Sequence, residues 1–284
     1  LISGAKATLK KQGVLKLIVH SNQMIEQYDD NWEKVADFNQ NLDEFYGKLG
    51  FSKASLSDFE KGFNFNYSKD LTGFENFAKL EKSYKKNGLQ TIKKARKLGI
   101  KICEATYDEL ADFKKVVDEA GERRQFSTRD LAYYQAVYQA FGDQVKFVLA
   151  KLNFKTEHEA NQLALDAVYQ EIEQAKAQNK KKSIDTLNQR VSRLDKFNVE
   201  LKTLAQTYGD RDVILAAAQF FIMPNEVIYM FSGMYDDFRE FSAPFLIQDY
   251  MLNYAYNHQI NQYQFMGVNA PDNPDQGVLK FKQN

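Results

Sequence analysis

Residues 143–154 read Asp-Gln-Val-Lys-Phe-Val-Leu-Ala-Lys-Leu-Asn-Phe, and they open a stretch without glycine or proline that lasts until Tyr208. This opening segment predicts a β-strand, because apolar and β-branched residues dominate it. The residues that follow change to a helical period, in which apolar side chains recur every three or four positions. In the first predicted helix these are Leu165, Val168, Ile172 and Ala175, and in the second they are Ile184, Leu187, Val191, Leu194, Leu201 and Ala205.

The two predicted helices form an antiparallel hairpin. A polar turn at residues 177–183 joins them, Ser183 is the expected N-cap of the second helix, and Gly209 is its expected end. Asn198 falls in the apolar series, where a polar residue commonly fixes the register of paired helices. Each helix would be about 20–25 residues, or roughly 30–37 Å, long. Because strands are predicted on both sides, the hairpin is an insertion into a sheet domain; a solvated arm without chemistry is the alternative.

Outside the hairpin, predicted helices and strands alternate, which indicates an α/β fold with a mixed sheet. The expected helices cover residues 1–11, 32–49, 77–98, 107–120, 128–141 and 242–257, and the expected strands cover residues 14–19, 63–67, 100–104, 213–222, 227–231, 263–268 and 275–282. The strand at 14–19 opens a short unit with too few strands to close a domain. We therefore expect the chain to begin inside its first domain.

Composition excludes several classes of site. The chain of 284 residues is 44% hydrophobic and has zero net charge, so it can bury a sizeable core and favours no partner by bulk charge. Its single cysteine, Cys103, allows neither an internal disulfide nor a cysteine-based zinc site. The three histidines are dispersed, and glycine-rich phosphate loops are absent, so we expect no metal and no cofactor. The longest apolar run is about half a membrane span. A cytoplasmic protein is expected, with contact at the inner face of the membrane left open.

Residues 79–101 form a strongly basic segment, with nine lysine and arginine side chains against one acidic residue, Glu81. Such a segment binds phosphate backbones through the release of counterions. It predicts RNA as a partner. The alternative is a solvated helix face balanced by acidic neighbours elsewhere.

Two further patterns suggest chemistry. Arg129 and Tyr133 are four residues apart on a predicted helix, so a guanidinium and a phenol can reach one carboxylate or phosphate. The alternative is a surface pair of Arg129 with Asp130, and Tyr133 in the core. Lys282 follows an aromatic residue on a predicted strand, where a fixed cation can stabilise the oxyanion of an acyl transfer. The alternative is an edge strand with a solvated lysine.

Several segments together resemble the Fem-type (FemABX) aminoacyltransferases, which build the peptidoglycan interpeptide bridge. In chain order they are Gly88-Leu-Gln-Thr-Ile-Lys-Lys-Ala-Arg-Lys-Leu-Gly-Ile-Lys, Phe126-Ser-Thr-Arg-Asp-Leu-Ala-Tyr-Tyr, Phe238-Arg-Glu-Phe-Ser-Ala-Pro-Phe-Leu-Ile-Gln, Tyr263-Gln-Phe-Met-Gly-Val and Gly277-Val-Leu-Lys-Phe-Lys. The resemblance implies tandem acetyltransferase-like (GNAT) subdomains. Residues 1–54 would be the remnant of an incomplete first subdomain, residues 55–152 with 208–284 the second, and residues 153–207 a coiled-coil arm.

The resemblance also implies an enzyme and its substrates. An amino acid would pass from aminoacyl-tRNA to the stem-peptide amine of a lipid-linked or UDP-linked muropeptide, without a metal, a cofactor or DNA. Because the family is longer at both ends, the resemblance leaves open whether this chain alone is active. The residues implied are Lys282 for the oxyanion, Phe281 for the shape of its pocket, Arg129, Tyr133 and Tyr229 for the precursor, and Lys93, Lys94, Arg96 and Lys97 for tRNA.

Two other functions remain open from the residues. A non-catalytic RNA-binding or interaction module on a degenerate transferase fold would use the same basic segment and arm. An acyl-CoA acetyltransferase is disfavoured, because its Arg/Gln-x-x-Gly-x-Gly/Ala loop does not occur. The aminoacyltransferase hypothesis predicts that Lys282, Arg129 and Tyr133 converge on one cleft.

Overall fold

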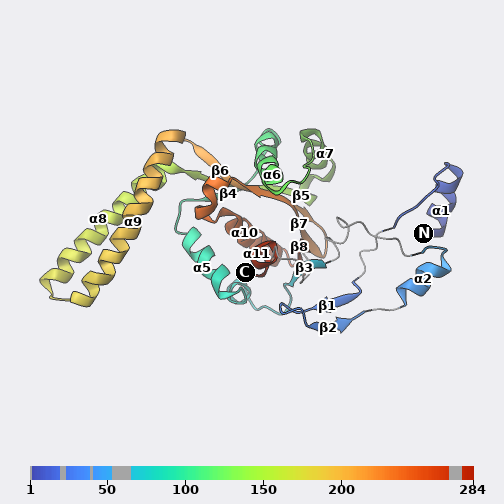
Figure 1. Ribbon diagram of the computed structural model, residues 1–284, viewed down its shortest axis with the longest axis horizontal. Helices are drawn as coiled ribbons and strands as arrows, with labels where there is room; N and C mark the ends of the chain where they lie inside the picture. The colour runs from blue at the N-terminus through green and yellow to red at the C-terminus, as the bar shows by residue number, and fades with distance from the viewer. Residues whose placement is uncertain (1, 20–23, 39–40, 53–64, 269–276) are drawn as a thin grey trace. The chain divides into compact units, whose positions relative to one another are not determined.

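The computed structural model describes residues 2–19, 24–38, 41–52, 65–268 and 277–284 (Figure 1). The chain divides into two compact units. The first comprises Leu1–Asn66 with Gly267–Gln283, and the second comprises Tyr67–Met266 with Asn284.

A six-stranded mixed sheet dominates the second unit, in the order β3-β8-β7-β6-β5-β4. Its strands are β3 (Phe65–Asp70), β4 (Lys101–Glu104), β5 (Val145–Asn153), β6 (Asp212–Ile222), β7 (Glu226–Met234) and β8 (Gln262–Val268). Strands β4 to β7 pair antiparallel, whereas β7 and β8 are parallel. This confirms the predicted α/β class with a mixed sheet.

Helices cover both faces of this sheet (Figure 1). The helices of the second unit outside the arm are α4 (Phe77–Lys82), α5 (Lys86–Ala95), α6 (Leu110–Arg124), α7 (Leu131–Phe141), α10 (Ala243–Asn257) and the 3-10 turns η1 (Gly142–Gln144) and η2 (Asp236–Phe241). On one face, Phe113 of α6 and Tyr134 of α7 pack edge-on against each other and around Phe147 of β5. On the other, Ile92 of α5 and Leu246 of α10 share a second core.

The predicted hairpin is present as α8 (Phe154–Ala177) and α9 (Lys181–Tyr208). The prediction that Ser183 caps α9 is wrong, because the helix already begins at Lys181 and the cap position is Lys180. Lysine is a good helix former, so the polar turn is shorter than its composition indicates. Gly209, at φ 69°, ends α9 as expected.

An amide network crosses the otherwise apolar contact between α8 and α9. The buried Asn161 donates from Nδ2 to Oδ1 of Asn198 and to the carbonyl of Leu194, both at 3.1 Å. Asn198 in turn donates to Oε1 of Gln162 at 3.1 Å. Only one alignment of the helices satisfies all of these groups, so the network fixes their register.

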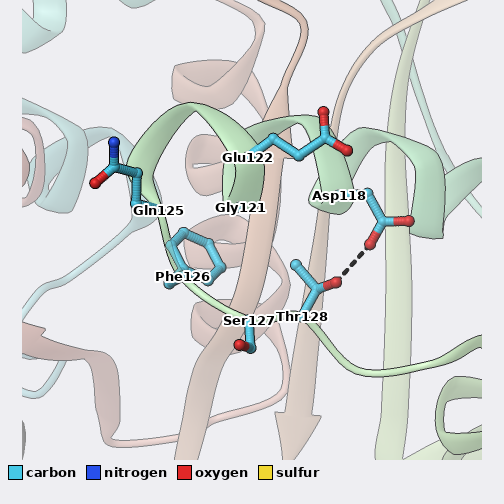
Figure 2. A pocket seen from close by; sticks show the side chains of 7 residues that line it. All are labelled: Asp118, Gly121, Glu122, Gln125, Phe126, Ser127 and Thr128. Carbon is cyan, nitrogen blue, oxygen red and sulfur yellow. Dashed lines mark hydrogen bonds between the residues drawn. The ribbon is translucent and has the colours of Figure 1, made fainter.

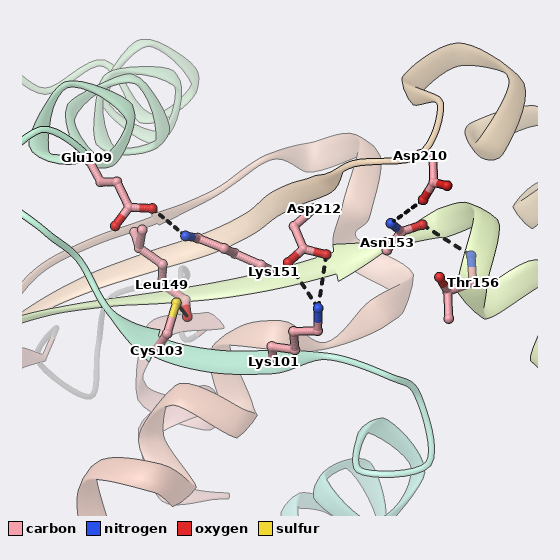
Figure 3. Close-up of polar contacts among 9 residues, drawn as sticks. All are labelled: Lys101, Cys103, Glu109, Leu149, Lys151, Asn153, Thr156, Asp210 and Asp212. Atoms are coloured by element: carbon pink, nitrogen blue, oxygen red, sulfur yellow. Dashed lines mark hydrogen bonds and ion pairs between the residues drawn. The ribbon is translucent and has the colours of Figure 1, made fainter.

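Polar side chains tie the base of the arm to the sheet (Figure 3). Asn153 caps α8 by accepting from the backbone nitrogen of Thr156 at 3.1 Å, and donates to Asp210 beyond α9 at 3.0 Å. Lys101 of β4 pairs with Asp212 of β6 at 3.1 Å. Glu157 in the first turn of α8 is buried and accepts from the backbone nitrogen of Gly99 at 2.7 Å. Both ends of the arm are therefore anchored where it leaves the sheet.

The first unit contains shorter elements. They are α1 (Ile2–Lys11), β1 (Glu26–Tyr28), β2 (Lys34–Asp37), α2 (Leu42–Lys48) and α11 (Gly277–Gln283). β1 and β2 pair antiparallel, and Trp32 between them packs on Tyr28 and Phe65. Among the helices that the structure describes in either unit, none has the length and apolar character needed to cross a bilayer.

Three predictions for this unit are wrong. Residues 14–19 form no strand and are largely exposed, because no neighbouring strand pairs with them within the described residues. The helix predicted over 32–49 begins only at Leu42, since Asp29 accepts from the backbone nitrogens of Asn31 and Glu33 and builds a turn there. Residues 277–283 are helical and bury Leu279, whereas a strand was predicted. Residues 63–64 and 275–276 of the predicted strands lie outside the described residues.

We expect the arm's amide network to be needed as a whole. Asn198→Leu leaves the buried amide of Asn161 short of a partner, which should lower the free energy of unfolding by roughly 1–3 kcal/mol. Replacing both Asn161 and Asn198 with leucine should recover most of that loss, because no buried amide is left unpaired. Urea unfolding measures both, with the exposed Asn188→Leu as control. If the double variant lost as much unfolding free energy as the two single substitutions added together, the side chains would not act as a network.

The buried Glu157 should make stability depend on pH. Burial raises its pKa above the ordinary 4.5, although the Gly99 hydrogen bond opposes this. Folded protein therefore holds this proton over a pH range in which unfolded chain has lost it, so stability falls as pH rises through that range. Glu157→Gln, whose side-chain oxygen can still accept from Gly99, should be more stable than wild type at pH 7. At a pH below 4.5 the two should match. The exposed Glu159→Gln is the control, and equal stability at both pH values would refute the effect.

Candidate functional site

The parallel ladder between β7 and β8 is short. It pairs Glu226–Met234 with Gln262–Val268 only at the start of each strand, from Glu226 opposite Gln262 to Ile228 opposite Gln264. Beyond Ile228, β7 keeps its antiparallel pairing with β6 as far as Met234. Among the described residues, no strand pairs with the second half of β7 on the side away from β6, which is a position suited to substrate binding.

A buried polar cluster marks the point where the strands part. Tyr229 is 9% exposed, stacks on Phe220 with ring centroids 5.4 Å apart, and donates its hydroxyl to Ser232. Tyr263 donates to Oε1 of Gln248 at 2.7 Å. Burial raises the pKa of both tyrosines, so both remain protonated donors. The structure thus places Tyr229, a predicted precursor contact, inside the sheet with its hydroxyl already engaged.

Arg129 and Tyr133 lie close together, but not as two positions of one helix. Arg129 precedes α7, whose N-cap is Asp130: the carboxylate of Asp130 accepts from the backbone nitrogen of Tyr133 at 2.8 Å. The predicted helical i, i+4 arrangement is therefore wrong. Instead the exposed guanidinium of Arg129 lies 5.4 Å from the centroid of the Tyr133 ring, a cation–π contact.

Tyr133 links this guanidinium to the open half of β7. Its ring packs edge-on against Phe231, with centroids 6.2 Å apart, and Phe231 lies three residues beyond the last β7–β8 pair. Stacking on a packed aromatic ring limits how the guanidinium can turn. An arginine held in this way can bind a carboxylate or phosphate through two parallel hydrogen bonds.

The loop that carries Arg129 borders a cavity of about 390 Å³ (Figure 2). Asp118 of α6 accepts from the hydroxyl of Thr128 and pairs with Lys114, which fastens the loop to the helix. Gly121 allows the close approach, since a Cβ there would lie 2.6 Å from Thr128 Cγ2 and 2.9 Å from the carbonyl of Phe126. The cavity wall is mostly polar and is formed by Asp118, Gly121, Glu122, Gln125, Phe126, Ser127 and Thr128.

Phe281 and Lys282 lie in α11 of the first unit, so the terminal strand expected to carry them is a helix. Nζ of Lys282 donates to the carbonyl of Gly267, near the end of β8, at 2.6 Å. Arg129 and Tyr133 belong to the second unit, and their convergence with Lys282 stays a prediction.

The four basic residues expected to contact tRNA differ in their surroundings. Lys93, Lys94 and Lys97 are exposed on and just after α5. The guanidinium of Arg96 contacts Asp249 and Glu81, each at 2.6 Å. Within the described ranges, no group of three histidine, cysteine or acidic side chains could hold a metal ion.

Sequence reasoning missed two residues that shape these sites. Asp130 had a usable signal, because an Asp directly before an apolar helical run is an N-cap pattern. Asp249 had none, since an acidic residue in the middle of a helix is ordinarily solvated and its partner Arg96 is 153 positions away.

Comparison with known proteins identifies the family. A model of the FemAB family matches residues 1–284. The chain belongs to the FemAB family. Among curated relatives, aminoacyltransferase FemA of Staphylococcus epidermidis is 32% identical over 208 residues, which cover 68% of this chain and 49% of that protein. FemA of Staphylococcus aureus strain N315 is 30% identical over 268 residues, or 86% of this chain and 62% of that protein.

This FemAB-family chain thus spans between about half and three fifths of the length of these relatives. The crystal structure of FemX matches it with a TM-score of 0.67 at 20% identity, over 88% of this chain and 66% of FemX. The likeness shows the fold: the mixed sheet of the FemAB-family chain is acetyltransferase-like, as the resemblance implied.

We expect the Asp130 cap to hold the Arg129 loop against α7. Asp130→Ala removes the acceptor for the Tyr133 nitrogen and should lower the free energy of unfolding by about 0.5–2 kcal/mol. Asp130→Asn, which can still cap, should cost much less. Thermal or chemical unfolding of the two variants measures the difference. Equal losses would show that the carboxylate acts through its charge and not as a cap.

Proposed function

We propose that the intact protein is an aminoacyltransferase of peptidoglycan interpeptide-bridge synthesis. It transfers an amino acid from aminoacyl-tRNA to the stem-peptide amine of a lipid-linked or UDP-linked muropeptide, on the cytoplasmic side of the membrane. The observation that carries this proposal is the FemAB match over the whole chain, together with the similarity to proteins named aminoacyltransferase FemA.

The reaction is an aminolysis of an ester. The acceptor amine attacks the ester carbonyl, a C–N bond forms, and the bond from the carbonyl carbon to the ribose oxygen breaks. A proton leaves the amine and one reaches the departing ribose hydroxyl, by way of water or the substrate. Lys282 stabilises the intermediate oxyanion, and Phe281 shapes its pocket. Positioning and charge stabilisation then provide most of the catalysis.

The remaining site residues bind substrate in this proposal. Arg129, held on Tyr133, takes a carboxylate or phosphate of the precursor. Tyr229 contributes through the packing of β7, because its hydroxyl is already bonded to Ser232. Lys93, Lys94 and Lys97 contact tRNA phosphates, and Arg96 supports that surface.

The division into subdomains is also a proposal, and it rests on the same family similarity. Residues 1–54 form the remnant of a first acetyltransferase-like subdomain, and residues 55–152 with 208–284 form the second. The inserted segment 153–207 is a coiled-coil arm that extends the tRNA-binding surface. The helical pairing of α8 with α9 supports this assignment.

A non-catalytic RNA-binding module is the second candidate. The exposure of Lys93, Lys94 and Lys97 on and just after α5 favours it, because a basic surface binds RNA without any transferase site. Salt-dependent tRNA binding without transfer to a muropeptide would distinguish this module from the enzyme.

The function is tested by incubating full-length protein with charged tRNAs and a lysine-containing muropeptide, and measuring the product mass. We expect the mass to rise by one or more aminoacyl residues. In the same assay, Lys282→Met should lower turnover by roughly 10²–10³, as the loss of one oxyanion donor does. Lys280→Met, exposed on the same helix, is the control.

The two results are read separately. Absence of any mass increase with every charged tRNA would refute the transferase. A mass increase that persists at wild-type rate in Lys282→Met would refute only the role of that lysine.

A further inference from the structure

A second cavity, of about 310 Å³, lies beside α5 and α10 at the edge strand β4. Its apolar lining includes Phe77, Ile102 and Tyr250, and its polar lining consists of Arg96, Asp249 and Asn253. It is separate from the β7–β8 opening and from the Arg129 loop. A cavity of this size fits a small, flat ligand and lies at the lower end of the usual range for ligand sites, about 300–1,000 Å³.

The polar wall contains the carboxylate of Asp249, of which only one oxygen accepts hydrogen bonds from the described residues. Arg96 donates from Nε at 3.2 Å and from Nη2 at 2.6 Å, and both bonds go to the same oxygen of Asp249, Oδ2. The residue is 8% exposed, and its other oxygen, Oδ1, is buried with no hydrogen-bond partner in the part of the chain that the structure describes. Burial raises the pKa of Asp249 against the influence of Arg96. An acceptor left in this state is costly unless a ligand completes it.

A donor stands one helical turn from this acceptor. Asn253 follows Asp249 by four residues on α10, so their side chains are neighbours on one helix face. Oδ1 of Asn253 already accepts from Asn257 at 2.8 Å, which leaves Nδ2 as the group able to donate to a ligand. The wall therefore offers an acceptor beside a donor, and the opposite wall offers aromatic and aliphatic surface.

We propose that this cavity binds an unpaired nucleobase at the single-stranded end of the RNA partner. The choice of RNA rests on the proposed function. A base has flat apolar faces, and its edge carries a donor beside an acceptor, such as an exocyclic amino group next to a ring nitrogen. The amino group donates to Oδ1 of Asp249, the ring nitrogen accepts from Nδ2 of Asn253, and the faces contact Phe77 and Tyr250.

The lysine side chains around the cavity carry positive charge, which suits the phosphates on either side of a bound base. Lys93 and Lys94 are exposed near the end of α5, and Lys97 is exposed next to Arg96, so phosphates adjoining the bound base meet cations. Arg96 has a different task. Its guanidinium is held by Asp249 and Glu81, and it is a positioning residue that orients the Asp249 carboxylate.

The test measures RNA binding by the full chain with fluorescence anisotropy. The probe is a short RNA with an unpaired 3′ adenosine, and the matched probe replaces that base with an abasic ribose. We expect the base to strengthen binding about ten-fold, in line with the stacking of one base. Asn253→Leu and the isosteric Asn253→Asp should each abolish the difference, whereas Asn87→Leu, an exposed change on α5, should preserve it.

Two further variants separate base recognition from charge. Changing Lys93, Lys94 and Lys97 to glutamine should flatten the salt dependence of binding and keep the preference for the base. Arg96→Lys keeps the charge but loses the planar fork that holds Asp249, so it should lose the base preference with the salt dependence unchanged.

Equal binding of the adenosine and abasic probes would overturn the proposal. So would a base preference that survives both Asn253 variants. Adenosine 5′-monophosphate that competes as tightly as the RNA would identify a free nucleotide as the ligand and overturn the assignment to an RNA end. The binding assay needs no muropeptide, so it is independent of the transfer assay. Base-dependent binding without aminoacyl transfer would refute the enzyme alone. Transfer without base-dependent binding would refute this cavity alone.

Discussion

The antiparallel ladder between β5 and β6 is the constraint on which the second unit depends. It runs from Val145 opposite Phe221 to Asn153 opposite Asp212, and the two helices of the arm leave from its far end. In chain order the arm is thus an enlarged hairpin connection between paired strands. Side chains at the junction, above all Asn153 with Asp210, close the gap where the strands give way to helices.

The two candidate binding sites of the second unit lie on opposite faces of the sheet. On one face, the loop that carries Arg129 connects α6 with α7. Tyr133 packs against Phe231 of β7, and the exposed guanidinium of Arg129 rests on the Tyr133 ring, so core packing restricts how the guanidinium can move. On the other, α5 and α10 enclose a cavity whose polar wall is organised by Arg96 and Asp249. The proposed aminoacyl transfer would join two unlike substrates, and two candidate sites on opposite faces of the sheet would keep them apart.

Sequence periodicity was sufficient to predict elements in which apolar residues recur at a regular spacing over many positions. It predicted β5, β6, α10 and both arm helices, because each of these has a long apolar face. It failed where a short segment depends on a tertiary partner. Residues 14–19 have the composition of a strand, but no strand among the described residues pairs with them, and residues 277–283 are too few for their period to separate helix from strand. The place of Arg129 could not be read from spacing alone, since a cap at Asp130 moved the helix start past it. The partnership of Arg96 with Asp249 joins residues far apart in the chain, and no local pattern encodes it.

The buried bond from Gly99 to Glu157 joins two parts of the molecule that otherwise have separate tasks. Gly99 lies three residues after Arg96 and directly before Ile100, which lines the α5–α10 cavity, whereas Glu157 belongs to the first turn of the arm. Swinging the arm away from the sheet would break this bond and release the backbone that shapes the cavity wall. Any movement of the arm that broke this bond would therefore be coupled to ligand binding in the cavity, and the coupling free energy would be the same in both directions.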